Sequence, residues 1–369
     1  MAQKFGRFWL HEKIGQGGMA EIFRATIGPD PQTYAFDVAL KRLHVALTRD
    51  TQQVDMFMTE ADVAKFLRHP SLVRVYESGI TDDQAYIAME YVWGLDLAQL
   101  LARLRARRLR FPTDLAVYVS LQVLRGLDYV HRARSPGGEP MDMVHRDVTP
   151  SNIYVTFDGK VKLGDFGVAR VKFLEAHEEQ RMLKGKITYM PPEVLAGQPI
   201  DQRLDLWSLA VSLYEMVTDR RVYEGVSEQD LAFGVTPPKV PLAHKVRPDV
   251  DARLGAVLAR ALHRNPRKRP QDAVELYRDL KDYLERSSIS VEADALGRFA
   301  RAATGMSPTQ QAPRTTPTTK SFQVPGYEPS GPSLTRRIQL AARRKVLLPI
   351  ALALLVVLAA AAGWFLRGH

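Results

Sequence analysis

The residues of this sequence that are best suited to chemistry lie close together near its middle. Asp147 and Asn152 belong to the run His145-Arg146-Asp147-Val148-Thr149-Pro150-Ser151-Asn152, and Asp165 follows soon after it. A carboxylate such as Asp147 can orient and deprotonate a hydroxyl group. Asn152 and Asp165 are hard oxygen donors, which suit Mg²⁺ held jointly with the phosphates of a substrate. The three side chains therefore indicate phosphoryl transfer to a hydroxyl.

A predicted β-hairpin would bring these side chains together. Asp158-Gly159 lies between two strand-like runs, residues 153–157 and 160–163, and this dipeptide is typical of a two-residue hairpin turn. Pairing the strand residues nearest the turn and counting outward puts Asn152 opposite Asp165, with their Cβ atoms about 5 Å apart. Any one Asp or Asn would more often be a cap or turn residue. The prediction therefore depends on their joint spacing.

A lysine and a glutamate earlier in the chain form a second candidate pair. Lys41 ends the apolar strand Val38-Ala39-Leu40, where a lysine is commonly just a solvated strand end. In the helix predicted from about Val54 to Leu67, however, Glu60 falls on the apolar face. A carboxylate on such a face needs a cation, and Lys41 is the economical candidate. The pair would fix the lysine ammonium for binding phosphate oxygens.

A glycine-rich turn lies near the start of the chain, in the run Ile14-Gly15-Gln16-Gly17-Gly18-Met19-Ala20-Glu21-Ile22-Phe23. A dinucleotide-binding fingerprint would have to open a helix, whereas residues 21–26 have strand character. A Walker A loop is excluded, because no Gly-Lys is followed by Ser or Thr. A loop that folds over nucleotide phosphates fits these residues, and an ordinary glycine-rich hairpin remains the alternative.

Together these motifs resemble the eukaryotic-like (Hanks-type) protein kinases of bacteria over nearly all of residues 8–284. The resemblance implies an α+β, two-lobed protein kinase fold. The N-lobe, about residues 8–90, would hold an antiparallel sheet and one helix, and the C-lobe, about residues 94–284, would be mainly helical. The implied activity is that of a Ser/Thr protein kinase, which transfers the γ-phosphoryl group of ATP with Mg²⁺, or Mn²⁺ as an alternative. Pro150 matches the Ser/Thr branch rather than the tyrosine branch.

The resemblance also assigns roles to individual residues. Asp147 becomes the catalytic base, Lys41 and Glu60 the ion pair, and Asn152 and Asp165 the Mg²⁺ ligands. The residues expected to bind the nucleotide come from the glycine-rich loop, the strand beside it, the hinge and the floor of the adenine pocket: Ile14, Gly15, Gln16, Gly17, Gly18, Ala20, Ile22, Ala39, Lys41, Met89, Glu90, Val92 and Tyr154.

Two further features follow from the resemblance, both in the second half of the matched region. Pro191-Pro192-Glu193 stands where the family has Ala-Pro-Glu, and Arg269 is the expected partner of Glu193. Residues 205–217, which are apolar on every side, would form the buried central helix of the C-lobe.

Several positions depart from the family pattern. The third loop glycine is Ala20, and Tyr154 replaces an aliphatic residue at the floor of the adenine pocket. Thr149 occupies the usual lysine position after the catalytic Asp, while Lys186 follows Gly185 where the family has Thr. The last two residues look exchanged, so that Lys186 would supply the ammonium beside the γ-phosphate and Thr149 the hydroxyl. The alternative is that Lys186 is a solvated loop lysine and Thr149 a tolerated substitution.

The C-terminal part of the sequence predicts a membrane anchor. Every residue from 346 to 366 is apolar, Gly or Pro, and a helix of that length can cross a hydrocarbon core of about 30 Å. Basic residues precede this segment and Arg367 alone follows it, so the predicted single-pass, C-terminally anchored protein keeps its kinase domain in the cytoplasm. Residues 285–345 are predicted to be a flexible linker with a basic juxtamembrane end that attracts anionic lipid.

Composition bounds the remaining alternatives. An apolar fraction of 46% supports a folded core, and the absence of cysteine excludes disulfides and thiolate metal sites. Nucleic-acid binding would rest on the formal charge of +10 alone, without a reading motif, and we expect none. The expected partners are protein substrates in membrane-proximal signalling, the kinase itself among them, and dimerisation is left open. A membrane-tethered pseudokinase scaffold is the alternative to an active enzyme.

Overall fold

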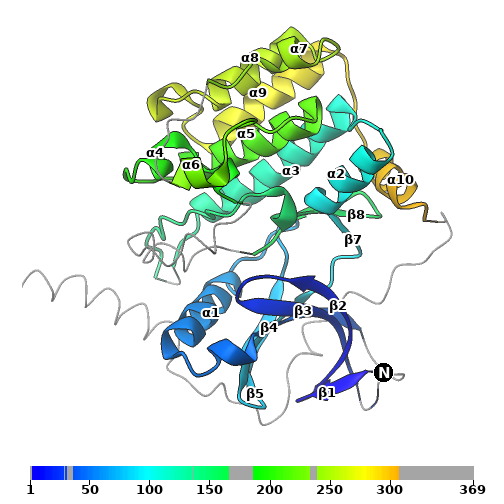
Figure 1. Cartoon of the computed structure of the whole chain (residues 1–369), viewed down its shortest axis with the longest axis vertical. Coiled ribbons are helices and arrows are strands. Elements are labelled where there is room, and N and C mark those ends of the chain that lie inside the picture. The colour runs from blue at the N-terminus through cyan, green and yellow to red at the C-terminus, as the bar shows by residue number, and fades with distance from the viewer. Residues whose placement is uncertain are drawn as a thin grey trace, which may run out of the picture. The chain divides into compact units, whose positions relative to one another are not determined.

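The computed structural model describes residues 2–28, 30, 36–135, 137–165, 186–232 and 239–306. These residues form the two lobes of a protein kinase fold, one built around a sheet and one mainly of helices (Figure 1). The segment 346–366, which the sequence predicts to cross a membrane, lies outside the described residues. Within them, no helix has the length and apolar character that a membrane span requires.

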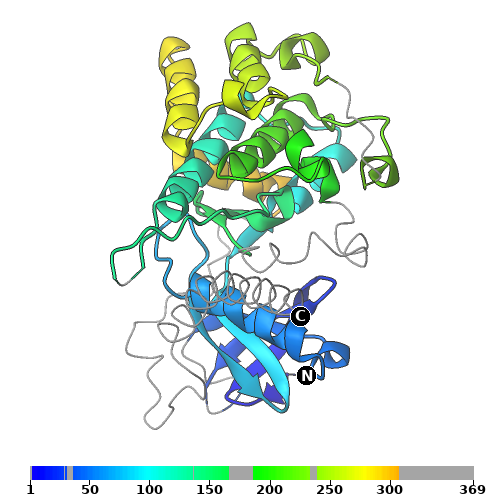
Figure 2. The same ribbon diagram turned by 90° about the vertical axis from the view of Figure 1, so that its left-hand side faces the viewer.

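The N-lobe is an antiparallel sheet with one long helix packed on it (Figures 1 and 2). Its described strands are arranged in the order β1-β2-β3-β4-β6-β5. Asp50 caps the helix, because its carboxylate accepts hydrogen bonds from the backbone N–H groups of Gln52 and Gln53. The elements are β1 (Gln3–Phe5), β2 (Phe8–Gln16), β3 (Ala20–Ile27), β4 (Asp37–Leu43), the 3₁₀ turn η1 (Val45–Leu47), α1 (Thr51–Ala64), β5 (Val75–Thr81) and β6 (Gln84–Glu90).

The helix α1 turns one face to the sheet. Phe57 and Ala61 on that face are buried against Leu43 of β4 and Ile87 of β6. Glu60 lies next to these apolar positions, as the helical period of the sequence predicts. The helix begins and ends three residues earlier than the sequence predicts, which moves none of these side chains to another face.

The C-lobe packs its helices around α5, whose residues from Leu204 to Thr218 are all buried. The prediction of a central helix over residues 205–217 is thereby confirmed. The elements after the hinge are β7 (Gly94–Asp96), α2 (Leu97–Ala106), α3 (Thr113–His131), η2 (Pro150–Asn152), β8 (Ile153–Thr156), β9 (Val161–Leu163), η5 (Ile187–Tyr189), α4 (Pro192–Leu195), α5 (Arg203–Thr218), α6 (Glu228–Ala232), α7 (Ala243–Val246), α8 (Ala252–Ala261), η6 (Pro266–Lys268), α9 (Ala273–Arg286) and α10 (Ala293–Thr304).

The hairpin β8–β9 forms, but the register predicted for it is wrong by one residue. Ile153 pairs with Leu163, so Asn152 lies opposite Gly164, and the backbone O of Asn152 accepts a hydrogen bond of 2.9 Å from Gly164 N. The loop contains three residues, 157–159, because Thr156 pairs with Lys160 through both its backbone and its hydroxyl.

The hairpin also contacts the strand that follows the hinge. Phe157 leaves the β8–β9 pairing and donates its backbone N–H to Trp93 O at 3.0 Å. Gly159 completes the loop at φ +82°, in the left-handed region that glycine enters without a steric cost. The prediction counts Phe157 as the last paired residue of the first strand. It therefore places Asp165 opposite Asn152, where the structure has Gly164.

Part of the predicted linker is helical. Residues 293–304 form α10, which buries Leu296, Ala300 and Ala303 against the C-lobe. Small and apolar residues at these spacings form a narrow stripe on one side of the helix. Because the region around the helix is polar in composition, the sequence analysis predicts a linker there and does not reveal this stripe. Residues 285 and 286 of the predicted linker belong to the end of α9, and the part from residue 307 onward lies outside the described residues.

A buried ion pair connects α4 with the residue that directly follows the 3₁₀ turn η6. Arg269 donates from both terminal nitrogens to the two carboxylate oxygens of Glu193, at 2.6 and 2.7 Å. The arginine is 1% exposed and the glutamate 8%. The guanidinium also lies over the ring of Trp207, 4.5 Å from its centroid, and its Nε donates to His263 O. This pair is the one that the kinase resemblance implies.

We predict that Arg269→Ala lowers the free energy of unfolding by about 3–5 kcal/mol, because it leaves the Glu193 carboxylate buried without a counterion. Urea denaturation followed by circular dichroism measures the change. Arg269→Lys keeps the charge but loses the paired geometry, and its loss should be intermediate. The control is Arg267→Ala, which removes an exposed arginine of the same turn. A loss below about 1 kcal/mol for Arg269→Ala, as at a surface pair, would contradict the prediction.

Candidate active site

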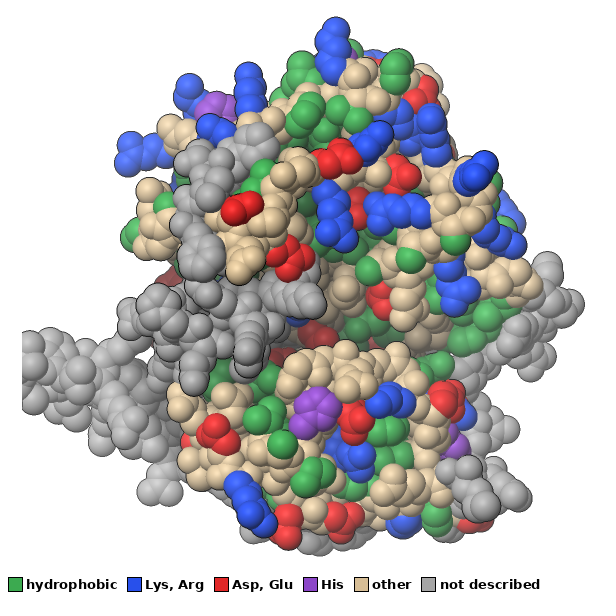
Figure 3. Space-filling view, in the orientation of Figure 1, with side chains coloured by type: hydrophobic (Ala, Val, Ile, Leu, Met, Phe, Trp, Pro, Cys, Tyr) green, Lys and Arg blue, Asp and Glu red, His purple; other side chains and the backbone are tan. Residues whose placement is uncertain are grey.

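Lys41 links the two lobes across the hollow between them, where acidic side chains are visible (Figure 3). Its Nζ lies 3.0 Å from Glu60 Oε1 on α1 and 3.0 Å from Asp165 Oδ1, just beyond β9. Burial opposes the charge of Lys41, but the carboxylates of Asp165 and Glu60 outweigh burial and raise the pKa of Lys41 above its ordinary value. The lysine therefore stays charged at every physiological pH.

Asp147 lies in the loop between α3 and η2 and is 4% exposed. Its carboxylate accepts a hydrogen bond of 2.6 Å from Lys186 Nζ, so the structure brings these two predicted residues into direct contact. Asn152 Nδ2 donates to the backbone O of Asp147 at 2.8 Å and thereby leaves its amide oxygen as an acceptor. Three of the predicted site residues thus meet around one loop.

The start of α5 holds this loop in place. Asp205 is fully buried, and its carboxylate accepts hydrogen bonds from the backbone N–H groups of His145 at 2.8 Å and Arg146 at 2.7 Å. His131 Nε2 lies 2.7 Å from the same carboxylate. Arg146 has φ +69°, a left-handed conformation that is uncommon for a residue other than glycine. Sequence analysis placed Asp205 at the start of a buried helix and missed this role.

The oxygen donors expected to hold Mg²⁺ flank the hairpin. Asn152 ends η2 directly before β8, and Asp165 stands two residues after β9, at φ +54°. Among the described residues, no cluster of three or more His, Cys, Asp or Glu side chains forms a metal site. One carboxylate and one amide oxygen nevertheless fit Mg²⁺, which usually takes one or two protein ligands and completes its shell with phosphates and water.

An apolar cluster lies beside these polar groups, between β3, β4, β6 and β8. Ala39, Val73 and Met89 are buried in it. The partly buried side chains packed around them include Ile22, Val92 and Tyr154, so the structure brings together the residues predicted to face the purine. Burial raises the pKa of Tyr154, and the charge of Asp165 adds to this effect. The phenol is therefore neutral at physiological pH.

The glycine-rich loop joins β2 to β3, strand to strand, as the sequence predicts. Ile14, Gly15 and Gln16 end β2, while Ala20 and Ile22 belong to β3. The turn between the strands, which includes Gly17 and Gly18, closes with a hydrogen bond of 2.8 Å from Gly17 N to Ala20 O. No atom of the described residues approaches within 4 Å of a Cβ built at Gly18, so this part of the structure leaves open space beside the turn.

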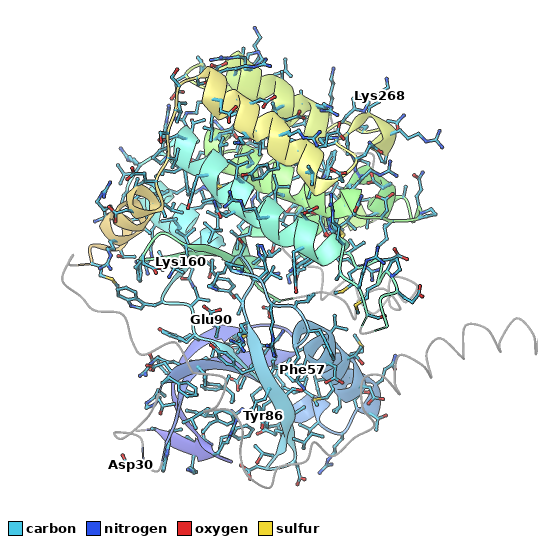
Figure 4. The ribbon with its side chains drawn as sticks, turned by 180° about the vertical axis from the view of Figure 1, so that it is seen from behind. Asp30, Phe57, Tyr86, Glu90, Lys160 and Lys268 are labelled. Carbon is cyan, nitrogen blue, oxygen red and sulfur yellow. The ribbon has the colours of Figure 1, made fainter. Side chains whose placement is uncertain are left out.

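Glu90 lies at the end of β6, where the chain passes from one lobe to the other (Figure 4). Its carboxylate lies 2.9 Å from Lys162 Nζ on β9 and accepts a hydrogen bond from Arg74 N. The side chain of Glu90 therefore connects the hinge to the hairpin, and only its backbone remains to meet a purine. Sequence analysis did not identify Lys162, because a lysine in a short strand gives no signal of a distant partner.

Thr149 lies in the same loop as Asp147 and is 5% exposed. Among the residues that the structure describes, its hydroxyl has no hydrogen-bond partner. A buried hydroxyl without a partner is unusual and costs free energy. Lys186 occupies the position beside Asp147, while Thr149 supplies only a hydroxyl. Phe166 and Gly167, which follow Asp165 in the predicted motif, lie outside the described residues.

Comparison with known proteins agrees with this geometry. The sequence profile of the protein kinase domain matches residues 8–280. The chain is 31% identical over 347 residues to the tyrosine-protein kinase MasK of Myxococcus xanthus, covering 90% of this chain and 53% of that protein. It is 27% identical over 294 residues to the serine/threonine-protein kinase PrkC of Bacillus subtilis, covering 78% and 43%. The chain spans about half the length of these curated relatives.

Solved structures give the same result. The kinase domain of PknI from Mycobacterium tuberculosis is 27% identical and superposes with a TM-score of 0.57, over 76% of this chain and 98% of that one. The profile match, which spans most of the chain, coincides with the two lobes and with the site between them. The chain belongs to the protein kinase domain family.

Proposed function

We propose that the protein is a Ser/Thr protein kinase that transfers the γ-phosphoryl group of ATP to hydroxyl groups of proteins. The observation that carries the proposal is the convergence of three ion pairs, those of Lys41 with Glu60 and with Asp165 and that of Lys186 with Asp147, on one hollow between the lobes. An apolar cluster lies next to them. The serine/threonine-protein kinases PrkC and PknL among the relatives support the same activity.

In this proposal each group has a defined task. Asp147 orients the acceptor hydroxyl and takes its proton. Lys41, fixed by Glu60, binds phosphate oxygens of ATP, and Asn152 and Asp165 would hold Mg²⁺. A bound Mg²⁺ would neutralise part of the negative charge of the phosphates. Ala39, Met89, Val92 and Tyr154 enclose the purine, and the turn from Ile14 to Ile22 covers the phosphates.

Lys186 takes the role that a lysine at position 149 has in other members of the family. Its ammonium contacts Asp147 directly, which places a positive charge next to the acceptor hydroxyl. Preorganised charge at a site of developing negative charge is commonly a large contribution to catalysis. Thr149, with its buried hydroxyl, is the other half of the exchange.

A tyrosine-directed kinase is the second candidate, because one relative, which matches 90% of the chain, is named a tyrosine-protein kinase. Pro150 in the catalytic loop supports the Ser/Thr assignment instead.

The pseudokinase alternative is disfavoured, since the catalytic and metal-binding side chains are all retained: Lys41, Glu60, Asp147, Asn152 and Asp165. The proposed substrates are proteins, with the kinase itself as one of them.

We further propose that residues 346–366 anchor the protein in the cell membrane, with the kinase domain in the cytoplasm. The uninterrupted apolar composition of this segment and the basic residues before it support the proposal. The basic cluster, which includes Arg343, Arg344 and Lys345, would contact anionic lipid headgroups. The kinase would then act on substrates near the membrane.

We predict that Asp147→Asn and Lys41→Met each lower phosphoryl transfer by at least about 100-fold, because each removes a group that acts on the reacting atoms. Transfer from γ-labelled ATP, followed by phosphoamino-acid analysis, measures both rate and specificity. The controls are Asp55→Asn and Lys245→Met at exposed positions. Background-level transfer by the unaltered protein would favour the pseudokinase, and phosphotyrosine as the main product would favour the second candidate.

We predict that Lys186→Thr lowers kcat by about 100-fold or more, because it removes the ammonium beside Asp147. Thr149→Lys alone should also be harmful, since it sets two ammonium groups side by side. The double exchange, Thr149→Lys with Lys186→Thr, should recover most of the activity, and a double-mutant cycle measures this coupling. Additive losses in the cycle, or near-full activity of Lys186→Thr, would contradict the exchange.

We predict that deletion of residues 346–369 releases an active kinase from the membrane fraction, because the apolar segment provides the attachment. Cell fractionation and an activity assay on the soluble fraction measure the result. Replacing Arg343, Arg344 and Lys345 with Gln should leave the full-length protein on the membrane. Retention of the truncated protein at high salt would show another attachment, since salt screens the basic cluster.

A further inference from the structure

The helix α10 lies beyond residue 280, where the match to the protein kinase domain ends, yet it is packed closely on the C-lobe. It lies beside β8 and α2 (Figure 1), and from behind it is seen next to the labelled Lys160 of the β8–β9 hairpin (Figure 4). Leu296 and Ala300 are fully buried in this contact. Burial of this extent shows that α10 is part of the folded lobe.

The helix meets the β8–β9 loop backbone against backbone. A Cβ added to Gly297 of α10 would lie 2.8 Å from Phe157 O and 2.9 Å from Gly159 N. A Cβ added to Gly159 would lie 1.7 Å from Ala293 O. Because real Cβ atoms do not approach so closely, only glycine fits at either position. The contact therefore depends on the particular residues of both elements.

Arg301 extends this contact to the hinge. Its Nε donates to Phe157 O at 3.0 Å, and its guanidinium lies over the ring of Trp93, 4.8 Å from the centroid. Trp93 packs edge-on against Phe157, with ring centroids 5.2 Å apart, and its backbone O accepts from Phe157 N. Trp93 directly follows Val92, which packs against the apolar cluster beside the polar groups of the site. One side chain of α10 thus holds the segment that forms the adenine pocket.

The end of α10 that carries Arg301 is itself fixed. Arg107, just after α2, donates to the backbone O atoms of Ala302 at 2.7 Å and Ala303 at 3.2 Å. These carbonyls belong to the last turn of the helix, where few intrahelical N–H donors remain, and Ala302 O also accepts a hydrogen bond of 3.2 Å from Gly305 N. Phe299 packs against Phe111, with ring centroids 5.1 Å apart. The position of Arg301 is therefore set by the C-lobe before any nucleotide binds.

We propose that α10 belongs to the nucleotide site and that Arg301 is a positioning residue, which fixes the hinge through Trp93 and so sets the affinity for ATP. The proposal rests on the proposed kinase function. A hinge that samples other conformations binds nucleotide only in the competent fraction of molecules, and the apparent affinity falls by that fraction. Because Arg301 is not among the groups that contact the reacting atoms, its effect falls on ATP binding and not on the chemical step.

The test compares two arginines of the same helix in the full-length protein. Arg301→Ala should raise the dissociation constant and the KM for ATP by about 10-fold and change kcat by less than about 2-fold, as expected when uniform binding is lost. Arg298→Ala is the matched control. Its side chain is 67% exposed and pairs with Asp294 of the same helix. Arg301→Lys, which keeps a cation over Trp93, should recover part of the affinity.

Calorimetric titration with ATP in the absence of acceptor protein separates this inference from the proposed function. If the unaltered protein binds ATP and phosphorylates substrate, but Arg301→Ala binds ATP as tightly as Arg298→Ala does, the positioning role is wrong. The role is also wrong if Arg301→Ala lowers thermal stability and kcat together while the dissociation constant stays unchanged. If the unaltered protein binds no ATP, the proposed function itself fails, and the inference fails with it.

Discussion

The geometry of the active site depends on a single buried carboxylate, that of Asp205 at the start of α5. An ionised group in the interior needs several donors to offset its lost hydration, and here the donors are the backbone N–H groups of His145 and Arg146. Arg146 holds a left-handed conformation that it would not adopt alone. The buried helix α5 thus fixes the loop that presents Asp147, and the hydrogen bonds that offset the desolvation of Asp205 also order this loop.

Much of the fold and part of the site could be predicted from the sequence, because those features follow from local periodicity. The helical period places Glu60 on the face of α1 that meets the sheet, and Lys41 is found opposite it. The strand character after the glycine-rich turn distinguishes a β-hairpin from a nucleotide-binding helix start. The stretch from 205 to 217 has apolar residues on every side of a helix, and this pattern predicts the buried helix that the structure shows.

Other features could not be predicted, because they depend on contacts between distant segments. The register of β8–β9 follows from the packing of Phe157 against Trp93, which no count along the hairpin reveals. The docking of α10 depends on small residues, Gly297 and Ala300, whose low hydrophobicity makes the segment look like linker. The prediction that Lys186 lies beside Asp147 comes only from two positions that depart from the family pattern. In the structure, Lys186 Nζ lies 2.6 Å from the carboxylate of Asp147.

The close approach of Gly159 to Ala293 also limits how this protein can vary. Hairpin loops are normally the places where insertions are tolerated and where chains are cut or fused, because they face solvent. Here the loop is covered by a helix from the end of the described chain, so any lengthening of residues 157–159 would have to displace α10. We therefore expect the length of this hairpin loop and the presence of a helix equivalent to α10 to change together among related kinases, so that either one serves as a marker for the other.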